Sequence, residues 1–136
     1  MTDNGVNRFV PIDEVDPDIQ DLVKNGLWKI PWIALYNSCA GHTDSNDLDV
    51  WGTSFVIKFS LLEVSKLDDL FDILFNLKSS LIKIHPELSE KLECTADAFS
   101  GRLRSFNVEF KYDTVGQKKV FINTFATVLS EYLRNQ

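Results

Sequence analysis

Six consecutive residues, Asn37 to His42, bring an amide, a hydroxyl, a thiol and an imidazole together directly after an apolar run. Loops that follow strands concentrate binding and catalytic groups, because the scaffold holds them in place. Gly41 permits backbone angles that other residues avoid. His42 titrates near neutral pH, so it could donate a hydrogen bond or act as a general acid or base. We therefore predict a small-ligand site, with nucleotide-like molecules as the candidate class, in the loop 37–49.

The residues of this predicted site fall into two sets. The candidate catalytic residues are His42 and Cys39, which could form an activated thiolate pair. The tryptophan that follows the loop could form the wall of a pocket for a flat ligand. The candidate ligand-binding residues are Asn37, Ser38, Gly41, Asp44 and Trp51.

The segment Ser38-Cys39-Ala40-Gly41-His42 resembles the Ser-Cys-Ser-Gly-Arg signature of the third wybutosine-synthesis protein family. These proteins are tRNA-modifying methyltransferases that depend on S-adenosylmethionine. Ser38, Cys39 and Gly41 match the signature, whereas Ala40 replaces its second serine and His42 replaces its arginine. Without that arginine, what the resemblance implies for this chain is a small-molecule pocket at the loop.

Other interpretations of the same segment stay open. Its small polar residues could form an ordinary Asx-rich turn that caps local backbone groups. The spacing of Cys39 and His42 would also suit zinc, with His85 and Cys94 completing a four-ligand set. The calcium-binding EF-hand pattern fails, because Asp49 stands where that loop requires glycine. We predict no metal site.

Apolar patterning predicts the elements around the segment. Residues 30–36 are apolar at both odd and even positions, which point to opposite faces of a strand. This pattern indicates a strand covered on two faces. Alternation over 51–61 predicts a second strand. A short helix precedes them, with Asp16 as N-cap, Pro17 in its first turn and Gly26 as its stop signal.

The second half of the chain predicts two further helices and two strands. Ser65 and Asp68 resemble a capping box that opens a helix reaching Pro86. We interpret the apolar stripe of that helix as core: Leu67, Leu70, Phe71, Leu74, Leu77 and Leu81.

Residues 91–99 fit a third strand, although 90–93 would also suit a helix. Residues 105–112 alternate strictly and predict a strand, and Val120 to Tyr132 predict a C-terminal helix of about four turns. The order α-β-β-α-β-β-α predicts an α+β fold, a two-layer sandwich with helices packed on one mainly antiparallel sheet.

Composition narrows the classes of partner. The chain carries 14 basic and 20 acidic side chains, a net charge of −6, which disfavours nucleic acid as a partner. It has neither a run of about twenty apolar residues nor an apolar N-terminal stretch, so we expect no membrane association and a cytoplasmic location. The mostly polar residues 1–15 predict a loosely ordered arm, and 16–136 a single domain.

An acidic surface also suits a different class of function. The chain could be a non-catalytic interaction or inhibitor protein, such as a phage accessory protein, that binds a partner protein. The sequence does not decide between this function and small-ligand binding, and it specifies neither an enzymatic activity nor a cofactor.

Overall fold

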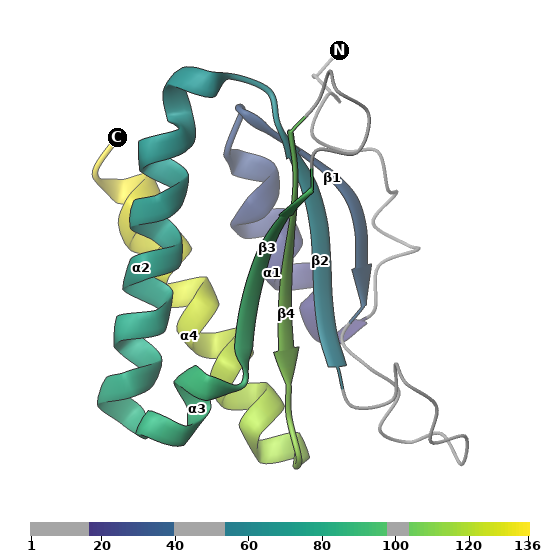
Figure 1. Ribbon diagram of the computed structural model, residues 1–136, viewed down its shortest axis with the longest axis vertical. Helices are drawn as coiled ribbons and strands as arrows, with labels where there is room; N and C mark the ends of the chain where they lie inside the picture. The colour runs from purple at the N-terminus through teal and green to yellow at the C-terminus, as the bar shows by residue number, and fades with distance from the viewer. Residues whose placement is uncertain (1–16, 40–53, 98–103) are drawn as a thin grey trace.

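The computed structural model describes residues 17–39, 54–97 and 104–136, which form a four-stranded antiparallel sheet with helices packed against it (Figure 1). The strands are β1 (Ile33–Cys39), β2 (Ser54–Leu61), β3 (Leu92–Asp97) and β4 (Arg104–Lys111). The helices are α1 (Gln20–Asn25), α2 (Leu67–Ile84), α3 (Pro86–Glu90) and α4 (Val115–Arg134). The predicted α+β sandwich is confirmed, whereas the predicted arm 1–15 lies outside the described residues.

The sheet has the order β1-β2-β4-β3 and consists of two hairpins. β2 pairs with β4 at the centre, and Ile57 lies opposite Val108. The strands alternate as the pattern predicts: Phe106, Val108 and Phe110 are buried, and Asn107 and Glu109 between them are partly exposed. The chain runs from β2 across the helical layer through α2 and α3 to β3, so β4 inserts between the two strands that this crossover joins.

Aromatic side chains of α4 join the helical layer to the centre of the sheet. The Phe121 ring stacks on Phe110 with centroids 4.2 Å apart, and it meets Phe55 edge-on at 4.8 Å. Phe125, one turn later, is also buried, and its ring centroid lies 6.4 Å from that of Phe55. The helix starts earlier than the predicted Val120, because Thr114 caps it by accepting a hydrogen bond from the backbone N–H of Gln117 at 3.1 Å.

Two contacts fix α1 and the 3-10 turn before it, Pro17–Ile19, against α4. A Cβ atom added to Gly26 would lie 2.9 Å from Leu129 Cδ1, so glycine allows the two helices to approach closely. Lys118 is buried in α4, and its ammonium contacts Asp18 Oδ2 at 2.7 Å. The same ammonium lies 5.5 Å from the Tyr112 ring centroid. The buried ammonium therefore has both a carboxylate partner and a cation–π contact.

Several predicted boundaries are wrong in detail. The predicted capping box is absent: a 3-10 turn over Val64–Lys66 leads into α2, and the cap position of α2 makes no side-chain hydrogen bond. The segment after α2 folds into α3 before the confirmed third strand begins at Leu92. Pro17 opens a 3-10 turn, Pro17–Ile19, ahead of α1, and Asp16 lies outside the described residues.

Candidate functional site

The structure describes only the first part of the predicted ligand site. Asn37, Ser38 and Cys39 belong to β1, where their backbones pair with Lys58, Ile57 and Val56 of β2. The prediction that the loop begins at residue 37 is therefore wrong, because pairing with β2 extends β1 past its apolar run. A register shift between Leu35 and Asn37 marks the start of this polar extension.

The other predicted site residues, Gly41, His42, Asp44 and Trp51, lie outside the described residues. Ligand binding in the 37–49 segment, and the resemblance to the wybutosine-synthesis family, thus remain predictions from the sequence.

Sheet order argues against the four-ligand zinc site. Cys39 ends β1 and Cys94 lies in β3, and these are the two outer strands of the described sheet. Three inter-strand spacings of about 4.8 Å separate them by roughly 14 Å. Two thiolates on one zinc ion need sulfur atoms about 4 Å apart. Cys39 and Cys94 therefore cannot share a metal ion.

His85 has a local structural role. It ends α2 and caps α3, where its Nδ1 accepts a hydrogen bond from the backbone N–H of Glu87 at 3.3 Å. Within the described ranges, no three His, Cys, Asp or Glu side chains gather closely enough to hold a metal ion.

Cys94 is exposed on β3, but its thiol is not activated. Desolvation by the surrounding protein raises the pKa of the Cys94 thiol; Lys78 lowers it and Glu93 raises it further. A raised pKa keeps the thiol protonated near neutral pH, and the thiolate is the nucleophilic form.

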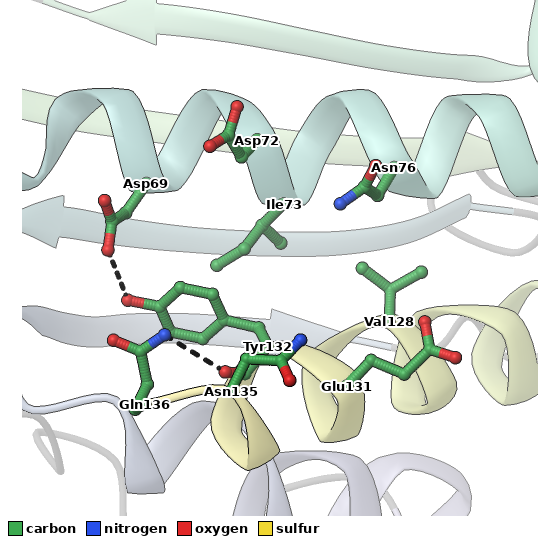
Figure 2. A pocket seen from close by; sticks show the side chains of 9 residues that line it. All are labelled: Asp69, Asp72, Ile73, Asn76, Val128, Glu131, Tyr132, Asn135 and Gln136. Atoms are coloured by element: carbon green, nitrogen blue, oxygen red, sulfur yellow. Dashed lines mark hydrogen bonds between the residues drawn. The ribbon is translucent and has the colours of Figure 1, made fainter.

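A concavity with a polar lining lies between α2 and α4 (Figure 2). It has a volume of about 310 Å³, and no basic side chain lines it. Acidic and amide groups dominate the lining: Asp69, Asp72, Asn76, Glu131, Asn135 and Gln136, with Ile73, Val128 and Tyr132.

Tyr132 is the organised group of this acidic groove. Its hydroxyl donates a hydrogen bond to Asp69 Oδ2 at 2.6 Å, and its ring meets Trp32 edge-on with centroids 6.1 Å apart. Burial raises the pKa of Tyr132 to about 12, and the Asp69 hydrogen bond and charge add to the rise, whereas a hydrogen bond with Trp32 opposes it. Tyr132 therefore stays neutral at physiological pH and joins α4 to α2 structurally.

A second surface lies on the other flank of α2, away from the groove. Phe71, Phe75 and Ile82 are 52%, 71% and 46% exposed, and Lys78 lies between them at helical spacing. We call these four residues the α2 face. Leu67 and Leu74 lie beside it, half-buried. The prediction that Phe71 belongs to the core is wrong, because the sheet and α4 cover only part of the apolar arc of this helix.

The α2 face adjoins an outer strand of the sheet. Lys78 acts electrostatically on Cys94, so α2 runs beside β3. In the described part of the chain β3 pairs only with β4, and residues 93–96 of β3 are exposed. This side of the domain thus presents an apolar helix and a sheet edge together.

The number of apolar residues in α2 is a sequence signal for the α2 face. Ten of the eighteen residues of α2 are apolar, but only Leu70, Ile73, Leu77 and Leu81 are buried. An apolar arc wider than one packed stripe indicates a helix with a second contact. Among the described helices, none combines the length and apolar character that crossing a bilayer requires.

Comparison of the chain with protein-family models, curated proteins and solved structures finds no match.

Proposed function

We propose that this chain is a non-catalytic protein-interaction domain and that it docks its partner on the α2 face. The observation that carries the proposal is the exposure of Phe71 and Phe75, two aromatic side chains one helical turn apart. Aromatic residues are enriched at the centres of protein interfaces, where they act as anchors.

The apolar area supports a docking role. With about 200 Å² for a fully exposed aromatic side chain, the two phenylalanines alone expose roughly 250 Å². Ile82 extends this patch towards the 300–600 Å² range of the largest patches on monomers, which are often functional. Burial at about 25 cal/mol per Å² would release roughly 6 kcal/mol, of which association retains only a part.

One flank of the α2 face has the polar character of an interface rim. Asp68, Asp72 and Lys83 are exposed and charged, and Ser79 between them is partly exposed. A polar rim around an apolar centre is the usual arrangement of a docking surface. Catalysis has less support: in the described part, Cys94 has a raised pKa and Tyr132 is tied to Asp69.

Site-specific photo-crosslinking in cells that express the chain tests the proposal. Benzoylphenylalanine in place of Phe75 should form a covalent adduct with a partner protein. The same group in place of Ser130, an exposed residue of α4, is the positional control. Equal adduct yields at positions 75 and 130 would show that the α2 face is not the docking surface.

A charge substitution provides a second control. Phe71→Asp should remove the adduct formed from position 75, because it places a charge at the centre of the apolar patch. Val115→Asp makes the same chemical change at another exposed apolar residue, which is 44% exposed at the start of α4. An adduct that survives Phe71→Asp would contradict the proposal.

A further inference from the structure

We propose that the partner of the α2 face is a second copy of this chain, docked with the two α2 helices antiparallel. This inference rests on the proposed docking role of the face and adds the identity and orientation of the partner. It is carried by the distribution of charge along and around α2.

The charges of α2 are divided between its two ends. Asp68, Asp69 and Asp72 lie in the first two turns, and Lys78 and Lys83 lie in the second half. At about 100° per residue, Asp68, Asp72 and Lys83 fall within about 60° of arc. They therefore form one flank of the α2 face, acidic at the start of the helix and basic at its end.

A two-fold axis through the middle of the α2 face makes this flank complementary to itself. In an antiparallel pair of helices the same flank of each copy meets that of the other, so Asp68 and Asp72 lie near Lys83 of the second copy. The two-fold axis repeats the contact on the other side. In a parallel pair the acidic ends would meet each other and repel.

The apolar centre fits the same arrangement. An axis between positions 76 and 77 places Phe71 opposite Ile82 of the second copy. It also places Phe75 opposite Lys78, whose aliphatic stem and ammonium can cover an aromatic ring.

The size of the contact predicts a weak dimer. An 18-residue helix is about 27 Å long, so the α2 contact alone is smaller than the ~800 Å² per partner of a standard interface. The exposed edge of β3 lies on the same side and can add to the contact. We expect reversible association in the micromolar range or weaker, as for interfaces at the small end of the size range.

Sedimentation velocity of the full chain from about 10 µM to about 1 mM measures this association. The average mass should rise from 15.5 kDa towards twice that value, 31 kDa. Lys83→Glu should weaken the association about tenfold or more, because each acidic end then faces an acidic residue. The pair Asp68→Lys and Asp72→Lys should weaken it similarly, because all the facing charges are then basic.

Mixing the two variants is the decisive measurement. The glutamate of one then faces the new lysines of the other, and the native aspartates face the native Lys83, so association should return to within about threefold of wild type. All three substituted residues are exposed, and recovery on mixing also shows that both variants are folded.

The outcomes separate this inference from the proposed function. A chain that stays at 15.5 kDa while position 75 crosslinks to a different protein overturns the second-copy inference and leaves the docking role standing. A dimer that neither charge variant weakens uses another surface and overturns the inference as well. A chain that neither dimerises nor crosslinks at position 75 overturns both proposals.

Discussion

Loss of the hydrogen bond between Tyr132 and Asp69 should weaken the contact between α2 and α4 at high pH. The bond requires a neutral phenol, and the folded protein raises the pKa of Tyr132 from 10.0 to about 12. The folded pKa lies above the unfolded value, so the stabilisation is fully present below pH 10. It is lost as the pH rises from about 10 to about 12.

The magnitude follows from the size of the shift. One pKa unit corresponds to about 1.36 kcal/mol, so the rise to about 12 sets an upper limit of about 2.7 kcal/mol on this contribution. The side chain of Asp69 is 34% exposed, and water screens part of its interaction with the phenol. We expect Tyr132 to contribute about 1 to 2 kcal/mol of pH-dependent stability.

Urea denaturation of wild type and Tyr132→Phe at pH 8 and pH 11 measures this contribution. Lysines and the other tyrosines titrate in both proteins. The loss of unfolding free energy between pH 8 and pH 11 in wild type, minus the loss in Tyr132→Phe, therefore gives the contribution of Tyr132 alone. Wild type should lose more stability between the two pH values than Tyr132→Phe does. Equal losses in the two proteins would refute the proposed pairing of Tyr132 with Asp69.

Three further predictions concern the core, the α1–α4 contact and the segment after β1. In urea denaturation, Phe121→Ala should lower the free energy of unfolding by about 3–5 kcal/mol and Phe75→Ala by less than about 0.5 kcal/mol, because only Phe121 is buried. Comparable losses in the two variants would contradict the exposure of the α2 face. Gly26→Ala should cost about 1–3 kcal/mol, since its methyl group would overlap the Leu22 carbonyl and Leu129, and an unchanged urea midpoint would show that the two helices separate freely. His42→Ala tests the sequence-based ligand hypothesis with S-adenosylmethionine and ATP as calorimetric probes. That hypothesis predicts that the wild type binds one of them and that the variant loses binding with unchanged stability; a wild type that binds neither refutes it, and a destabilised variant that still binds would indicate a structural histidine.

Local patterning was sufficient to predict the parts of the fold that depend on neighbouring residues. Phe106, Val108 and Phe110 alternate with polar residues, and the structure shows them buried in β4, because a sheet covered by helices imposes that period. The polar end of β1, Asn37 to Cys39, carries no such signal. Its extended backbone comes from pairing with β2, which is a tertiary interaction.

The exposed residues of α2 show a different limit. Phe71 and Leu70 both fit a helical apolar stripe, and only the positions of the sheet and α4 decide that Leu70 is buried and Phe71 exposed. The sequence therefore predicts the helix and the width of its apolar arc, but not which flank remains available for a partner. The site predicted after β1 depends on residues that the structure does not describe.

The insertion of β4 between β2 and β3 has a consequence for the order of folding. Each hairpin joins strands that are close in the chain, whereas the central β2–β4 ladder joins Ser54 to Lys111 and Leu61 to Arg104. These pairings close loops of about 40 to 60 residues, and the entropy of closure must be overcome before the central ladder stabilises the chain. Substitutions in the β2–β4 ladder should therefore act mainly on the folding rate if this ladder forms in the transition state, and mainly on the unfolding rate if it forms afterwards.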